Sequence, residues 1–143
     1  MTEELEQKLF AKYPKIFVDK DKSMNETCMC WGISTGDGWY WLLDKLCSSI
    51  QWRIDNPPHD KNGPMPIDQV VAEQVKEKFG GLRFYYRGGD EAIHGKVGLA
   101  ESMSNGICEE CGSTKNIGHT LGWISTLCED CKDKNKNKWF KDE

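Results

Sequence analysis

The sequence predicts a small α+β protein in which about three main helices pack on a small antiparallel sheet, with a C-terminal four-cysteine zinc-ribbon lobe. Three observations predict this fold class: apolar residues recur at helical spacing in several segments, a compact aromatic run lies at residues 82–86, and two Cys-x-x-Cys pairs occupy the last third of the chain. At 143 residues the chain has the length of one ordinary domain. We divide it into an α+β domain at 1–106, a zinc-ribbon module at 107–132 packed on that domain, and a basic tail at 133–143.

Four segments have the apolar periodicity of helices. A short helix is expected over residues 1–13, and the two strongest patterns cover 39–54 and 66–79. The second of these begins at a proline and is followed by Gly80-Gly81, which suits a left-handed helix end. A further helix is expected over 91–104.

The remaining segments predict strands, turns and loops. Residues 82–86 predict a compact strand, and residues 28–33 are short, apolar and compatible with a strand. Asp37 follows a turn-forming stretch and is a candidate N-cap for the helix that comes after it. The run 59–66 is rich in Pro, Gly, Asp and Asn, which predicts a loop, and residues 130–139 could form a short terminal helix.

Four cysteines near the C-terminus, Cys108, Cys111, Cys128 and Cys131, predict one structural zinc site. Zinc takes four ligands in a tetrahedron, and each Cys-x-x-Cys pair lets two thiolates reach the ion from one tight turn. Gly112 follows the second ligand, where such a turn often needs a positive φ. Four thiolates leave no coordination position for water, so we expect a structural ion and not a catalytic one.

Three other roles for these cysteines are less well supported. A redox Cys-x-x-Cys usually stands alone near a βαβ pattern, which this sequence lacks. A rubredoxin-like iron site favours a flanking glycine that the second pair does not have. Two disulfides would require an oxidising compartment.

Composition predicts a soluble globular protein, with 38% hydrophobic and 29% charged residues. No window approaches 18 apolar residues and the acidic N-terminus does not look like a secretory signal, so we expect no membrane association and a cytoplasmic location. The formal net charge of −4 disfavours nucleic-acid binding, which depends on Lys and Arg, although a local basic face stays compatible with the sequence.

The other three cysteines could form a second metal site with His59, but we favour the interpretation that they are small buried hydrophobic residues. Cys47 lies on the apolar stripe of its helix, and Cys28 and Cys30 belong to the short apolar segment at 28–33. The histidines are scattered in polar surroundings, and we expect all three to be exposed: His59, His94 and His119.

Acidic residues supply a weak candidate for an acid/base set: Asp37, Asp44, Asp90 and Glu91. Asp37 and Asp90 each lie in a glycine-containing turn before a helix, which capping alone explains. An enzyme would also need a pocket with convergent polar groups, and the sequence does not supply one. We therefore expect no enzymatic activity.

A candidate interaction surface combines basic and aromatic residues: Arg83, Tyr85, Arg87 and Trp123. The strand at 82–86 interleaves aromatic and basic residues, as surfaces that stack nucleic-acid bases do. The alternative, which we favour for the aromatic run as a whole, is that these side chains pack under the helices. Trp123 belongs to a stretch that could form a small hairpin over the zinc site.

Three segments of the chain, together with the paired cysteines, resemble a family of small bacteriophage and prophage proteins without an assigned activity. They are Cys-Met-Cys-Trp-Gly at 28–32, Gly-Asp-Gly-Trp-Tyr at 36–40 and Lys-Glu-Lys-Phe-Gly-Gly-Leu-Arg-Phe-Tyr at 76–85. The resemblance covers roughly residues 5–131. It implies a phage origin and the cytoplasm of the infected bacterium, and it transfers no functional residue.

The resemblance favours a non-enzymatic accessory protein that binds a host or defence-system protein, and hence a candidate inhibitor of bacterial anti-phage defence. The acidic balance and the surplus of aromatic residues agree with such a role. The alternative is a zinc-ribbon protein that binds nucleic acid through the ribbon, the arginines of the 82–86 region and the lysine-rich tail. The sequence leaves the identity of the partner and the oligomeric state open.

Overall fold

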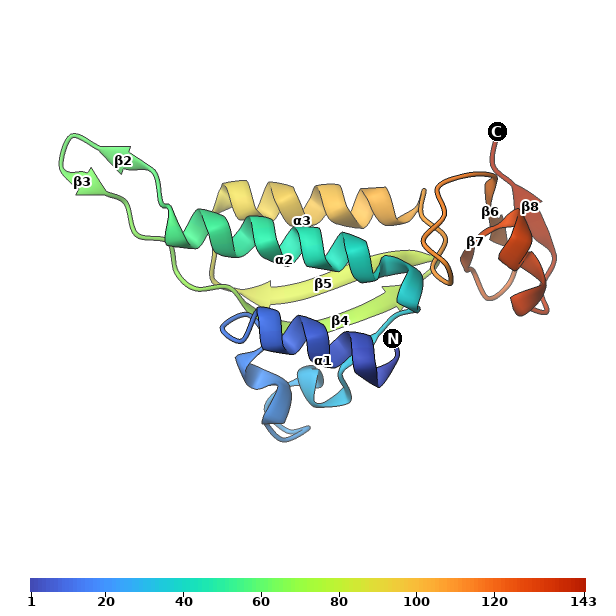
Figure 1. Ribbon diagram of the computed structural model, residues 1–143, viewed down its shortest axis with the longest axis horizontal. Helices are drawn as coiled ribbons and strands as arrows, with labels where there is room; N and C mark the ends of the chain where they lie inside the picture. The colour runs from blue at the N-terminus through green and yellow to red at the C-terminus, as the bar shows by residue number, and fades with distance from the viewer.

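A three-stranded sheet in the order β1-β4-β5 forms the centre of the N-terminal region in the computed structural model, which describes residues 1–143 (Figure 1). β4 (Val71–Lys78) and β5 (Gly81–Arg87) are antiparallel, whereas β1 (Ile33–Ser34) runs parallel to β4. The fold is thus a mixture of helices and small sheets, as predicted, but the central sheet is mixed and not purely antiparallel.

Two long helices run side by side along this sheet (Figure 1). α3 (Glu91–Ser104) packs on β5, and α2 (Tyr40–Asp55) packs against α3. Both segments were predicted as helices, and their bounds agree within one residue with the expected ranges. Asp90 caps α3 as expected, because its side chain accepts a hydrogen bond from the backbone N–H of Ile93 at 3.0 Å.

The N-terminal segment lies beside β4 (Figure 1). α1 (Glu3–Lys12) is followed by two 3-10 helices, η1 (Val18–Asp21) and η2 (Cys28–Trp31), so the segment 28–33 is mostly a helical turn and not a strand. A third 3-10 helix, η3 (Asp37–Trp39), leads into α2. The largest fully buried side chains of this region form one core with the sheet: Trp39, Phe17, Leu9, Ile16, Met29 and Leu43.

The predicted helix at 66–79 is wrong, because β4 occupies most of that segment. Val70, Val71 and Val75 are β-branched, and such residues pack well on a pleated sheet. A register shift between Ala72 and Gln74 breaks the simple alternation, which lets the apolar pattern imitate a helical one. Pairing along the whole length of β5 then stabilises the strand, and a prediction from local pattern does not include that pairing.

The predicted loop at 59–66 contains a short hairpin that projects beyond the end of α2 (Figure 1). β2 (His59–Asp60) pairs with β3 (Gly63–Pro64) in antiparallel register. Both strands are short and proline-rich around their ends, so this arm adds no side chain to the buried core.

The C-terminal region is a separate three-stranded antiparallel sheet in the order β7-β6-β8. Its strands are β6 (Ile117–Thr120), β7 (Thr126–Cys128) and β8 (Trp139–Lys141), and the 3-10 helix η4 (Glu129–Lys134) connects the last two. The residues predicted as a basic tail therefore include a strand of the ribbon. Similarly, only the first part of the predicted terminal helix at 130–139 is helical.

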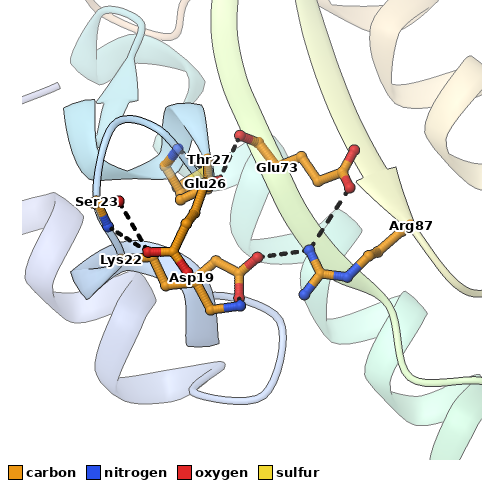
Figure 2. A network of polar contacts seen from close by, with 8 residues as sticks. Asp19, Lys22, Ser23, Glu26, Thr27, Glu73 and Arg87 are labelled. Carbon is orange, nitrogen blue, oxygen red and sulfur yellow. Dashed lines mark hydrogen bonds and ion pairs between the residues drawn. The ribbon is translucent and has the colours of Figure 1, made fainter.

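A buried carboxylate joins the N-terminal segment to the central sheet (Figure 2). Asp19 is 2% exposed, and its Oδ2 accepts a hydrogen bond of 2.6 Å from Arg87 at the end of β5. The Lys22 ammonium lies 2.8 Å from the other oxygen. Nearby, the Thr27 hydroxyl donates to the backbone carbonyl of Glu73 on β4 at 3.2 Å. These contacts hold η1 and η2 against the sheet.

Candidate metal centre

The four predicted cysteines come together in the C-terminal ribbon. The sulfur atoms of Cys108, Cys111, Cys128 and Cys131 all lie within 4.8 Å of one another, and Cys111 Sγ is 3.6 Å from Cys128 Sγ. They form the only group of three or more His, Cys, Asp or Glu side chains in the structure that could hold a metal ion. Three are buried and Cys111 is exposed.

The separations of the sulfur atoms fit a shared metal ion. An ion with metal–sulfur bonds of about 2.3 Å in a tetrahedron has sulfur–sulfur edges of about 3.8 Å. A disulfide would need a bond of about 2.05 Å, and all seven cysteines of the chain are free. The four residues therefore have the geometry and the donor chemistry of a tetrathiolate site.

Backbone turns position each pair of sulfurs. In the first pair, Gly112 N–H donates to the Cys108 carbonyl at 2.9 Å, and Cys108 N–H donates to the Ser113 carbonyl at 2.8 Å. Gly112 has a φ of +78°, the left-handed conformation that the sequence predicted at this position. The second pair begins at the end of β7, where Cys128 is opposite Ile117 in the sheet, and continues into η4.

The thiols differ in acidity even before a metal is bound. Burial raises the pKa of Cys108, but the nearby backbone amides of Cys128, Cys111 and Glu110 stabilise its thiolate and hold this pKa below its ordinary value. Burial and the neighbouring thiols of Cys128 and Cys111 raise the pKa of Cys131. One thiolate is thus favoured, while ionising all four requires a cation among them.

The first Cys-x-x-Cys turn is attached to the α/β region through η3, the 3-10 helix that precedes α2. Gly38 N–H donates to the Glu109 carbonyl at 2.7 Å, and the Trp39 indole N–H donates to the Ile107 carbonyl at 2.9 Å. The approach is so close that a Cβ atom on Gly38 would lie 2.1 Å from the Cys108 carbonyl oxygen. Only glycine fits at this position.

A second attachment joins the ribbon to the β4–β5 turn. The Thr126 hydroxyl donates to the Gly80 carbonyl at 2.6 Å, and a Cβ atom on Gly80 would lie 2.8 Å from the Ile124 side chain. Two of the segments behind the resemblance, 36–40 and 76–85, therefore contact the ribbon directly. The contacts between the two regions account for Gly38, Trp39 and Gly80 in these segments.

The predicted interaction residues lie on two different elements. Arg83, Tyr85 and Arg87 alternate along β5, while Trp123 lies in the turn between β6 and β7. Tyr85 and Trp123 are exposed, but Arg83 is half-buried and donates to the backbone carbonyl of Leu82. Arg87 is engaged by Asp19 and lies 3.6 Å from Glu73, so its guanidinium has a structural role.

The remaining cysteines do not gather into a second metal site. Cys47 is buried as expected, and burial raises the pKa of its thiol. Cys28 is exposed and Cys30 is half-buried, so the prediction that all three are buried hydrophobic residues is wrong for this pair. The helical turn of η2, which differs from an extended strand, places Cys30 Sγ 3.3 Å from the Thr27 carbonyl.

The histidines lie on three separate elements. His59 and His94 are exposed, as predicted. His119 is half-buried on β6, where its Nδ1 lies 2.8 Å from Asp142, so the expectation of full exposure is wrong for this residue. The C-terminal residues that follow β8 cover it.

Three of the four acidic candidates have a structural partner, whereas Glu91 is exposed at the start of α3. Asp37 does not cap α2 as predicted; its carboxylate instead accepts from the backbone N–H of Thr2 at 2.7 Å. Asp44 accepts hydrogen bonds from Lys12 and from the Tyr13 hydroxyl, both at 2.7 Å. Asp90 accepts from Arg53 with both oxygens, from Nε on Oδ1 at 3.2 Å and from Nη2 on Oδ2 at 2.9 Å.

An apolar groove between α2 and α3 is the main surface feature that the sequence reasoning missed. It has a volume of about 230 Å³, and its lining includes Trp41 and Leu42 on α2 with Leu99 and Met103 on α3. Trp41 is 59% exposed and Leu99 is 63% exposed. The sequence contains one indication of this apolar surface, because Trp41 and Trp52 lie on the otherwise polar stripe of their helix.

Comparison of the chain with protein-family models, with curated proteins and with solved structures gives no match. No helix in the structure combines the length and the apolar character needed to cross a membrane.

Proposed function

We propose that this protein is a zinc-containing, non-enzymatic protein-binding module, a phage accessory factor that engages a host or defence-system protein in the bacterial cytoplasm. An inhibitor of anti-phage defence is the specific form of this role. The phage assignment and the location come from the resemblance of the segments at 28–32, 36–40 and 76–85.

The observation that carries this proposal is the groove between α2 and α3. Six of its nine lining residues are hydrophobic, and they include the exposed Trp41, Leu99 and Met103. Large apolar side chains gathered at a hollow mark surfaces that bind other molecules more often than isolated exposed residues do. Tryptophan at such a surface contributes strongly to protein association.

The metal centre, in this proposal, holds zinc and stabilises the fold. Four thiolates in a tetrahedron satisfy Zn²⁺ completely, and thiolate is the protein ligand that zinc prefers. The ribbon has a buried cluster of only five residues, three of which are cysteines: Cys108, Ile117, Leu127, Cys128 and Cys131. So small a core needs the ion to fold.

Metal analysis tests this assignment. Protein purified without added metal should contain one zinc ion per chain, and Cys131→Ser should lower the zinc content while the matched variant Cys28→Ser retains it. Cobalt substitution should give the thiolate absorption bands of a tetrahedral site. Iron in place of zinc, or disulfides without metal, would contradict the assignment.

Paired surface variants test the binding role. Trp41→Ala and Leu99→Ser remove the apolar wall of the groove, whereas Trp31→Ala and Leu121→Ser change side chains of similar exposure, 65% and 60%, elsewhere on the surface. Capture of a defined host protein from lysate, quantified by mass spectrometry, should fall at least about tenfold for the groove pair, as expected for loss of an interface hot spot. Equal capture by both pairs would contradict a role for the groove.

Nucleic-acid binding is the second candidate, and the position of β8 favours it. Because β8 joins the ribbon, the tail lysines lie on a folded surface. Lys136 and Lys138 of the tail, with Lys132 of η4, line an open polar hollow of about 460 Å³ beside Trp139. Basic residues near exposed aromatic rings suit single-stranded nucleic acid. Fluorescence anisotropy with labelled single-stranded and duplex DNA and RNA tests this; no salt-sensitive binding at low ionic strength would exclude it.

A further inference from the structure

We propose that the groove between α2 and α3 binds an acidic amphipathic helix of the partner protein. This inference rests on the proposed binding function and names the chemistry of the segment that the groove accepts. It is carried by the shape of the groove, by the nature of its walls and by the charge of its rim.

The shape of the groove suits a helix. α2 and α3 lie side by side, and the connection through β4 and β5 makes them run in opposite directions (Figure 1). The groove extends along α2 from Trp41 to Ser49, which is about 12 Å at the helical rise per residue. Two packed helices with an apolar groove between them accept a third helix through residues at positions i, i+3, i+4 and i+7.

The walls of the groove offer apolar contact at little cost in desolvation. Hydrophobic side chains form most of its lining, with Trp41 on the α2 side and the flexible Met103 on the α3 side. On the α3 side, Leu99 and Ala100 continue this apolar lining, and Leu99 is 63% exposed.

The charge of the rim selects the partner. Lys45 and Lys96 are the only charged residues that line the groove, in a chain whose net charge is −4. Lys96 donates to the Ser49 hydroxyl at 2.7 Å and has no carboxylate partner, while Lys45 is 3.9 Å from Asp44. Two under-neutralised ammonium groups beside an apolar floor complement a helix with carboxylates along its apolar stripe.

The same charges argue against a second copy of this chain as the occupant. In a symmetric dimer each surface patch meets its own copy, so Lys45 and Lys96 would face the same two lysines. Like charges that meet across an interface oppose association. An acidic segment of another protein is therefore the better match.

Two designed peptides test the proposal on the full zinc-loaded chain. Both are helical, about 14 residues or four turns long, and share one apolar stripe; one carries Glu beside the stripe and the other carries Lys. Isothermal titration calorimetry should show the acidic peptide binding about tenfold more tightly, and this preference should shrink as salt is raised from about 50 to 300 mM.

Charge-reversal variants provide the matched comparison. Lys45→Glu with Lys96→Glu should reverse the preference in favour of the basic peptide, whereas Lys61→Glu with Lys115→Glu, away from the groove, should leave it unchanged. Leu99→Ser should weaken both peptides. Circular dichroism and zinc content identify any variant that fails to fold. If the double glutamate variant does not fold, Lys45→Gln with Lys96→Gln takes its place, and this variant should abolish the preference for the acidic peptide.

Several results would overturn the inference. Equal affinity for both peptides, no binding of either, or a preference that survives charge reversal would each do so, as would dimerisation that Leu99→Ser abolishes. Failure of the proposed function is distinguishable, because it appears as host-protein capture that is unaffected by Trp41→Ala and Leu99→Ser. Capture that depends on the groove, together with charge-independent peptide binding, would reject only the acidic helix.

Discussion

Asp19 illustrates how a single carboxylate can be buried in this fold. Its side chain is almost completely covered, and a buried charge without a partner is strongly destabilising. Arg87 donates to one oxygen and Lys22 lies beside the other (Figure 2). Both basic side chains are about half exposed. The hydrogen bond from Arg87 is the main reason that the pKa of Asp19 falls to about 2, against the opposing effect of burial.

Acid titration of stability tests the role of this residue. A carboxyl group whose pKa is lower in the folded state stabilises the protein above its unfolded pKa, near 3.8, and loses this contribution as the pH falls towards about 2. The contribution is about 2 kcal/mol at neutral pH. Asp19→Asn should therefore lower the free energy of unfolding at pH 7 by about that amount and should remove the corresponding acid dependence.

Protonation of the cysteines also occurs in acid, so the informative quantity is the difference between wild type and variant measured by denaturant unfolding at each pH. Asp21→Asn is the matched control, because Asp21 is highly exposed and pairs only with Lys20. A constant difference between wild type and Asp19→Asn from pH 7 to pH 2 would contradict the assigned pKa.

At the scale of elements, the turn between β4 and β5 contains an unusual conformation. Phe79 has a φ of +53° and Gly80 a φ of +77°, and the flanking residues Lys78 and Gly81 pair directly. Two consecutive positive φ values in a two-residue turn are typical of type I′ hairpins, where Asn-Gly is preferred. A bulky residue in this conformation costs about 1–2 kcal/mol, and Phe79 is 72% exposed, so burial does not compensate.

Phe79→Asn should accordingly stabilise the hairpin. We expect the free energy of unfolding to rise by about 1 kcal/mol, because asparagine tolerates the left-handed region and little buried surface is lost. Thermal and denaturant unfolding measure the change. Phe79→Ala is the control: it removes the same ring but keeps the strained conformation, so a similar gain from alanine would show that the ring, and not the backbone, causes the strain.

The elements that the sequence predicts correctly are those fixed by local pattern. The 39–54 and 91–104 helices have apolar residues on one face and pack through that face, and the two Cys-x-x-Cys pairs needed only their spacing to indicate one site. β4 was missed because its identity depends on pairing with β5, and the apolar spacing within one segment does not include that pairing. The groove was missed because it exists only where two helices, distant in sequence, lie side by side.

For the whole molecule, we expect stability and metal retention to depend on the joint between the α/β region and the ribbon. Gly38→Ala places a methyl group against the Cys108 carbonyl, which is backbone and cannot rotate away. We expect a loss of about 2 kcal/mol in stability, as for overpacked cores, together with faster zinc release to a chelator. Gly98→Ala is the matched control, since its methyl group meets nothing and should stabilise α3 by about 1 kcal/mol.

Release of zinc is monitored with a colorimetric chelator, and stability by urea unfolding of both variants. Gly38→Ala that binds zinc as tightly as wild type and unfolds at the same urea concentration would show that the ribbon can dock without this close contact. The contact at Gly38 would then tolerate a side chain, and loss of the metal would not affect the α/β region through it.

A second hollow lies between the metal centre and the groove, and it would couple metal binding to the proposed partner binding. Cys111 and Gly112 line a hollow of about 320 Å³ together with Trp41 and Leu42, and the same two residues of α2 line the groove. Trp41 therefore stands between the first Cys-x-x-Cys turn and the proposed binding surface. Loss of the ion should loosen that turn and remove one support of the exposed indole ring.

Chelation of the zinc should for this reason weaken binding of the acidic peptide by several-fold, and not only unfold the ribbon. Hydrogen exchange should show faster exchange at residues 107–141, followed by 36–41, while the Asp19–Arg87 contact on β5 keeps its neighbourhood protected. The order matters, because exchange at 36–41 reports the joint directly. If these amides stay protected and peptide affinity is unchanged after the ribbon unfolds, then the groove is autonomous and the zinc serves the ribbon alone.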